Sequence, residues 1–179
     1  GNWSFGDYFK EEAIAMSWEL LTSVFGLDPN RIVVTTHYSD DEAAAIWKKV
    51  SGKDAILLGD KDNWWSAGDT GPCGPCTEMH YDMGDDLPGG LPGSANEDGG
   101  RFVEIWNDVF MQYNKKEDGT FEPLQQKNVD TGMGLERMVF LLQGKNNVFE
   151  TELFTTIIAK TKELSKNVND ESLRIIADH

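Results

Sequence analysis

The segment Arg101–Tyr113 constrains the fold of this chain more than any other stretch. It is apolar and aromatic, and its side chains alternate with the period of two that is typical of a β-strand. Asp118-Gly119 then predicts a hairpin turn, and Phe121-Glu122-Pro123-Leu124 predicts the returning strand. We therefore expect an antiparallel sheet with flanking helices, an α+β fold class.

Strict alternation divides this strand between two faces. One face would carry Phe102, Glu104, Trp106, Asp108, Phe110 and Gln112, and the other Val103, Ile105, Asn107, Val109, Met111 and Tyr113. Asn107 would then be a polar residue within an apolar face, and Glu104 would be a charged residue on the opposite face. A buried amide needs hydrogen-bond partners, so Asn107 belongs either to a core network or to a ligand contact.

The rest of the chain alternates helices and strands. Apolar residues at helical spacing predict a long helix over Asp7–Phe25, capped by Asp7 and stopped by Gly26. The other expected elements are strands at Arg31–Thr36, Ala55–Leu58 and Thr77–Asp82, and helices at 39–50, 134–142, 150–164 and from Glu171 onward. We expect turns over 62–76, and over 83–100 a solvent loop that is either a tolerated insertion or a functional lid.

Composition narrows the class of protein. A hydrophobic content of 39% within 179 residues is enough for one folded domain with a core. We find no apolar run of membrane length and no signal pattern, so we expect a soluble protein of the cytoplasm or of an organelle, with no membrane partner. The net charge of −15 argues against a DNA-binding face and places most RNA contacts outside this chain.

The two cysteines form a single Cys-x-x-Cys, Cys73 and Cys76, among glycines and prolines. A structural zinc site needs about four ligands, and His37, His80 and His179 lack paired metal spacing. A redox pair usually heads a helix, whereas a strand pattern follows here. Structural or ligand-adjacent thiols, a zinc site and a redox site all remain open at this point.

The chemistry centres on the stretch Val129–Met138, where an extended segment passes into a helix through two glycines. Gly132 and Gly134 leave room for a ligand near the backbone, and Asp130 and Arg137 flank that floor. Such a site suits a substrate with an ammonium group at one end and phosphates or a purine at the other. The alternative is an ordinary strand-to-helix connection with a surface salt bridge.

Several segments together resemble the catalytic domain of the alanyl-tRNA synthetases, a family of class II aminoacyl-tRNA synthetases. The match covers essentially the whole chain in order. The segments that carry it are Gly1–Lys10, Asp62–Trp65, Gly68–Glu78, Glu104–Gln112, Asp130–Arg137 and Arg174–His179. The first is similar to the end of class II motif 2, and Asp130–Arg137 to motif 3.

The resemblance implies roles for individual residues. Asp130 would pair with the amino group of alanine, and Arg137 would stack on adenine and neutralise phosphate; these are the expected catalytic residues. Further alanine contacts would be Trp65, Asn107, Val109 and Gly132, and further ATP contacts Glu104 and Gly134. Mg²⁺ would accompany ATP, with Glu104 as its candidate residue, and no zinc is expected.

The family's reaction is ATP-dependent activation of alanine to alanyl-adenylate, followed by transfer to tRNA(Ala). The resemblance makes residues 1–168 a partial aminoacylation domain, incomplete on its N-terminal side, and 169–179 the start of a helical tRNA-recognition region. We therefore expect this chain, taken alone, to be impaired in activity, with tRNA bound mainly elsewhere. The alternatives are a catalytically inactive synthetase-like regulatory or interaction module, and a zinc or redox domain built on Cys73 and Cys76.

Overall fold

The computed structural model describes residues 1–166 and 169–179, which form two compact units, Gly1–Met133 and Gly134–His179. The first unit is a sheet with helices, and the second is helical. The predicted α+β class, with a largely antiparallel sheet flanked by helices, is confirmed. The domain boundary expected after residue 168 falls at residues that lie outside the described ones.

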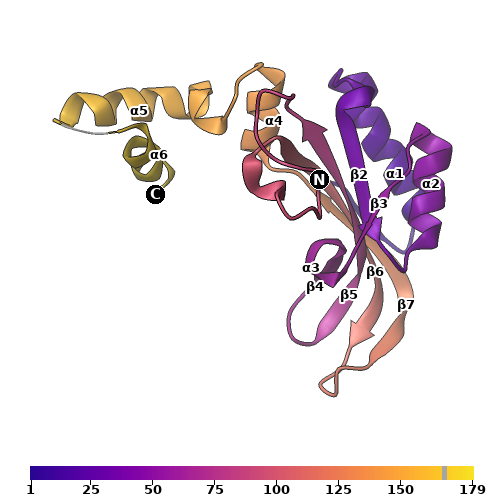
Figure 1. Cartoon of the computed structure of the whole chain (residues 1–179). Coiled ribbons are helices and arrows are strands. Elements are labelled where there is room, and N and C mark those ends of the chain that lie inside the picture. The colour runs from indigo at the N-terminus through magenta and orange to yellow at the C-terminus, as the bar shows by residue number, and fades with distance from the viewer. Residues whose placement is uncertain (167–168) are drawn as a thin grey trace. The chain divides into compact units, whose positions relative to one another are not determined.

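A seven-stranded sheet forms the first unit (Figure 1), in the order β1-β7-β6-β5-β2-β3, with β4 paired to β5. Its strands are β1 (Trp3–Phe5), β2 (Ile32–His37), β3 (Ile56–Leu58), β4 (Trp64–Ser66), β5 (Gly71–Asp82), β6 (Phe102–Lys115) and β7 (Phe121–Gly132). In the described residues β2 and β3 pair in parallel and the other neighbours pair antiparallel. The predicted hairpin at Asp118-Gly119 therefore joins the two long central strands β6 and β7.

Two helices, α1 (Lys10–Glu19) and α2 (Asp41–Ser51), run along the same side of this sheet (Figure 1). A π-helical turn, Leu20–Val24, extends α1 to nearly the predicted end. The predicted cap at Asp7 is wrong, because α1 begins at Lys10 and no side chain caps it. The start of α2 was predicted correctly: Asp40 caps it by accepting a hydrogen bond from the Ala43 amide at 3.1 Å.

Side-chain contacts fix which face of the sheet these helices cover. The ring of Phe9, just before α1, meets the ring of Phe110 on β6 at 5.5 Å. Ser17 Oγ donates to Asp108 Oδ1 at 2.9 Å. From α2, Trp47 Nε1 donates to Thr77 Oγ1 on β5 at 2.7 Å. We call this side of β5 and β6 the helix-covered face, and the other side the open face.

The strict alternation predicted for β6 is wrong, because β6 carries two irregularities. Met79 on β5 pairs with Trp106, but His80 pairs with Glu104, so Ile105 is an extra residue. Opposed residues share a face, and Glu104 therefore lies on the same side as Asn107, which pairs with Glu78.

The second irregularity lies where Cys73 pairs with Tyr113 and Cys76 pairs with Val109, so that two intervening residues of β5 oppose three of β6. As a result, Tyr113 shares the helix-covered face with Cys73. The prediction of turns over 62–76 is also wrong. A short helix α3 (Asp60–Asn63) leads into β4, and the Gly-Pro-Cys repeat is part of β5. Pro75 lies within this break in the β5–β6 register, where a missing amide donor is tolerated.

The segment 83–100 is a loop, as predicted, and contains the short 3₁₀ turn Glu97–Gly99. Its base is held by Arg101, whose Nε and Nη2 each donate to the Asp82 carboxylate at 2.8 Å. This bidentate pair also holds the pKa of Asp82 below its usual range.

The second unit contains α4 (Leu135–Leu142), α5 (Glu152–Leu164) and α6 (Asp170–Asp178). These helices agree with the predicted ones to within two residues. Asn169 caps α6 by accepting from the Ser172 amide at 2.8 Å, and Leu173 is its buried residue. Among the described residues, no helix has the length and apolar character needed to cross a membrane.

Asp108 makes the stability of the first unit depend on pH. Burial raises the pKa of Asp108 to about 7, although hydrogen bonds from Trp106 and Ser17 lower it. An unfolded aspartate has a pKa near 4, so the folded chain loses stability as pH rises from about 4 through about 7.

We therefore expect Asp108→Asn to have a larger free energy of unfolding than the parent. This difference should increase by about 2 kcal/mol between about pH 5.5 and about pH 8.5, because only the parent has a buried carboxyl group that ionises in this range. Urea unfolding at the two pH values measures it. Asp86→Asn removes the same charge from an exposed loop position and should show no such growth. A pH-independent margin for Asp108→Asn would contradict the assignment.

Candidate active site

The strand register brings separate predicted site residues together on the open face. Asp130 of β7 lies opposite Val109 of β6, and Gly132 lies opposite Asn107. Asn107 in turn pairs with Glu78 of β5, the strand that carries Cys76 opposite Val109. Because opposed residues share a face, these side chains form one surface across three neighbouring strands.

The two adjacent tryptophans of β4 divide between the two faces. Trp65 lies opposite Gly74 and Trp64 lies opposite Pro75. Gly74 is two residues from Cys76 along β5, so Trp65 joins the open face. A Cβ on Gly74 would lie 2.0 Å from the Phe110 carbonyl oxygen, and only glycine therefore fits at this crossing. Trp65 pairs with this glycine, so its position on the sheet depends on the close approach of β5 and β6 at Gly74.

Asn107 presents an unused acceptor on the open face. Its Oδ1 is buried and has no hydrogen-bond partner within the part of the chain that the structure describes. The side chain also interacts with the thiol of Cys76, as does that of Asn63 from α3. Asn63 is itself buried and donates from Nδ2 to Thr35 Oγ1 at 3.0 Å. These contacts hold the Asn107 side chain through Cys76, and they do not involve its Oδ1.

Acidic side chains give the open face a negative charge. Glu78 Oε2 lies within hydrogen-bonding distance of His80 Nε2, at 3.1 Å, and His80 lies opposite Glu104. Asp130 is half-buried, and no Lys, Arg or His in residues 1–166 and 169–179 forms an ion pair with it. Such a surface favours cationic groups over anions, since carboxylates attract positive charge.

Gly134 and Arg137 belong to the second compact unit, Gly134–His179. Gly134 immediately precedes α4, and Arg137 lies in its first turn. A Cβ on Gly134 would meet the Arg137 side chain at 3.4 Å, an ordinary contact. The residues expected to bind alanine, and Glu104, therefore lie on the open face of the first unit. The other two expected ATP contacts, Gly134 and Arg137, lie in the second unit.

The geometry of the cysteines decides between the alternatives left open by the sequence. Cys73 and Cys76 are both free and buried, and they lie three residues apart on β5, so they point to opposite faces. One metal ion cannot reach both thiols, and they cannot bond to each other in the strand. Burial raises the pKa of Cys76 to about 12 and also raises that of Cys73, the reverse of a reactive thiolate.

Sequence reasoning did not single out Asn63, and it left the role of Cys76 open among structural or ligand-adjacent, zinc and redox alternatives. Both lie within the turn-rich stretch 62–76, where neither hydrophobic period nor spacing gave a signal. Among the described residues, no group of three or more His, Cys, Asp or Glu side chains lies close enough together to hold a metal ion.

Comparison with known proteins gives one consistent result. Residues 1–179 match the profile of the family described as tRNA synthetases class II (A). The chain is 53% identical over 191 residues to the alanine–tRNA ligase of Xylella fastidiosa (strain 9a5c), covering 100% of this chain and 22% of the relative. The same enzyme of Dinoroseobacter shibae is 53% identical over 189 residues, with 100% and 21% coverage. The chain thus spans about a fifth of the length of the curated relatives it matches.

Two glycines of the sheet make a matched pair for testing this geometry. Gly74→Ala should destabilise the first unit by about 3 kcal/mol, because the new Cβ would collide with the backbone of β6. Gly132→Ala should cost less than about 1 kcal/mol, since a Cβ there meets no atom within 4 Å. Urea unfolding of both variants measures the difference, and equal losses would contradict the register described here.

Proposed function

Because the chain belongs to the class II (A) tRNA synthetases, whose profile it matches from end to end, we propose that it forms the alanine-binding part of an alanine–tRNA ligase. In the longer protein this part would activate alanine with ATP to alanyl-adenylate and serve its transfer to tRNA(Ala). The names of the relatives support the assignment. The observation that carries it is the pair of acceptors, Asp130 and Asn107 Oδ1, on one face of the sheet.

These acceptors suit the α-ammonium group of an amino acid. An ammonium has three donors and no acceptor, and here it would meet the Asp130 carboxylate and Asn107 Oδ1, an oxygen with no hydrogen-bond partner among the described residues. Val109, buried opposite Asp130, and Trp65 would then wall the side-chain pocket. A wall of this kind excludes larger side chains, at about 1–3 kcal/mol per additional methylene.

Gly132 would leave the space through which the substrate approaches. A Cβ at this position faces an empty region, and the residue lies directly opposite Asn107. The glycine is therefore not needed for packing within the chain, which supports a role toward a ligand.

The proposed reaction needs positioning more than covalent help. An oxygen of the alanine carboxylate attacks the α-phosphorus of ATP, the new O–P bond forms, and pyrophosphate leaves. Alignment and charge neutralisation supply most of the rate in such a transfer. We assign Arg137, in the second unit, to adenine stacking and phosphate neutralisation, with Gly134 beside it.

Mg²⁺ would accompany ATP and neutralise phosphate charge when bound. It commonly uses only one or two protein carboxylates together with phosphate oxygens and water. Glu104 lies on the open face opposite His80, whose ring contacts Glu78, so the carboxylates present fit that requirement. This part of the face therefore serves the phosphates, while Asp130 and Asn107 serve the amino acid.

The partners of the longer protein follow from the same proposal. The net charge of −15 disfavours a large RNA surface on this chain, so tRNA(Ala) would bind mainly outside it. Residues 1–168 would then belong to the aminoacylation domain, and residues 169–179 would begin a helical tRNA-recognition region.

Calorimetric titration with a non-hydrolysable alanyl-adenylate analogue tests the proposed site. We expect the chain to bind it, and Asp130→Asn to weaken binding about 10- to 100-fold through loss of the charged hydrogen bond. Gly132→Ala should weaken binding while costing less than about 1 kcal/mol of stability, and Asp86→Asn should leave binding unchanged. Absence of binding by the folded parent chain would contradict the proposal and favour an inactive interaction module.

Activity is a separate question from binding. In alanine-dependent pyrophosphate exchange, we expect the 179-residue chain to be slow, since it spans about a fifth of the length of the relatives. Rapid exchange that Asp130→Asn abolishes would show instead that this chain suffices for activation.

A further inference from the structure

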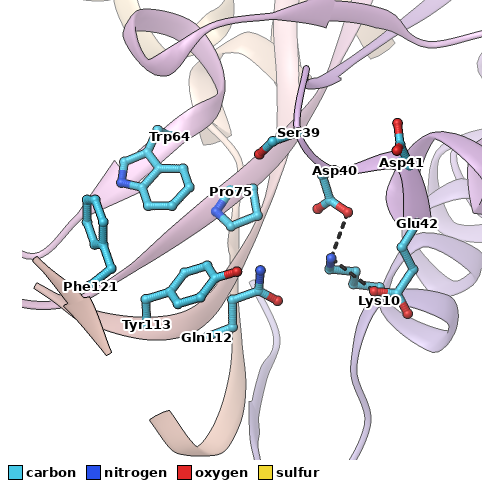
Figure 2. Close-up of a pocket in the computed structure, with 10 residues that line it drawn as sticks. All are labelled: Lys10, Ser39, Asp40, Asp41, Glu42, Trp64, Pro75, Gln112, Tyr113 and Phe121. Carbon is cyan, nitrogen blue, oxygen red and sulfur yellow. Dashed lines mark hydrogen bonds and ion pairs between the residues drawn. The ribbon is translucent and has the colours of Figure 1, made fainter. Parts of the chain in front are cut away.

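A cavity of about 450 Å³ opens on the helix-covered side of the first unit (Figure 2). It is separate from the proposed alanine site, because Trp64 lines it and lies opposite Pro75, whereas Trp65 lies opposite Gly74 on the open face. The proposed reaction therefore uses one of the two adjacent tryptophans and leaves the other unexplained.

One wall of the cavity is aromatic (Figure 2). Trp64 stacks on Tyr113 with ring centroids 6.0 Å apart and an interplanar angle of 14°. Phe121 meets Trp64 edge to face at 5.4 Å, and its side chain is 49% exposed. Rings from β4, β6 and β7 thus present an accessible surface with the negative electrostatic character that attracts cations.

The facing wall is acidic and belongs to the start of α2. Asp40 Oδ1 accepts from Lys10 Nζ at 2.7 Å, and Glu42 also contacts Lys10 at 3.1 Å. Asp41 lines the cavity beside them. Three carboxylates here face one ammonium, so the wall keeps a net negative charge despite the partial positive charge of the helix start.

Asp40 carries an unsatisfied oxygen at this wall. The residue is only 5% exposed, and its Oδ2 has no hydrogen-bond partner in the described part of the chain. Leaving a buried carboxylate oxygen without a donor is costly, so a ligand that donates a hydrogen bond would stabilise this site. Lys10 does not fill this role, because its Nζ donates to Oδ1.

We propose that this cavity binds a guanidinium group, stacked against the aromatic wall and hydrogen-bonded to Asp40 Oδ2. A guanidinium is planar, always charged and weakly hydrated, and it has several donors in its plane. It therefore matches a stacking surface and a carboxylate at the same time, which a compact ammonium does less well. The group comes either from a small free guanidinium compound or from an arginine side chain of a peptide.

Nuclear magnetic resonance of the ¹⁵N-labelled full chain tests this, with the indole N–H signal of Trp64 assigned through Trp64→Phe. Agmatine and a capped Gly-Arg-Gly peptide are titrated separately. We expect a saturable shift of the Trp64 signal with a Kd on the order of 1 mM or lower. The tighter of the two ligands identifies the source of the guanidinium.

Two variants at accessible positions avoid disturbing the helix cap. Asp41→Asn and Phe121→Leu should each raise the Kd about fivefold, and Asp86→Asn, which removes the same charge outside the cavity, should leave it unchanged. The amide spectra of the variants report directly that they remain folded.

Three results would overturn the proposal. One is the absence of a saturable Trp64 shift with either ligand. Another is equal binding of the uncharged citrulline counterpart of the peptide, which would remove the need for a cation. The third is an equal effect of Asp86→Asn and Asp41→Asn, which would assign binding to the general negative charge of the protein. None of these outcomes bears on the proposed alanine site.

Discussion

The pairing of β6 with its two neighbours is the constraint on which the rest of the structure depends. This strand lies between β5 and β7, and its register sets which residues of all three strands share a face. A slip by one residue would move every side chain to the other side of the sheet. The placement of Asn107 opposite Gly132, and of Val109 opposite Asp130, is therefore a property of the ladder and not of any single motif.

The two faces of the sheet divide stability from proposed function. On the helix-covered face, Ser17 and Trp47 reach from α1 and α2 to polar groups of β6 and β5, and Phe110 packs beneath them. The open face carries the half-buried Asp130 carboxylate and a buried amide oxygen, Asn107 Oδ1, that has no partner in the part of the chain that the structure describes. The helix-covered face also has a buried oxygen without a partner among the described residues, Asp108 Oδ2, so the proposed role of the open face rests on its acceptors together with the empty space at Gly132.

Sequence reasoning predicted the hairpin and the helix start near Asp40 because each has a local signal. It did not predict the irregularities of β6, since an extra residue such as Ile105 changes the register without changing the apolar content. For the same reason Glu104 was assigned to the wrong face relative to Asn107. The stretch 62–76 was misjudged because glycine and proline normally indicate turns, whereas the break in the β5–β6 register accommodates Pro75 within a strand.

The central claim is that the open face of this ladder holds an amino acid by its ammonium group. A crystal structure of the chain with the alanyl-adenylate analogue tests it most directly. The account predicts the ammonium nitrogen within hydrogen-bonding distance of both the Asp130 carboxylate and Asn107 Oδ1, with the methyl group directed toward Val109. An analogue bound elsewhere, or bound with its ammonium away from Asp130, would contradict the account.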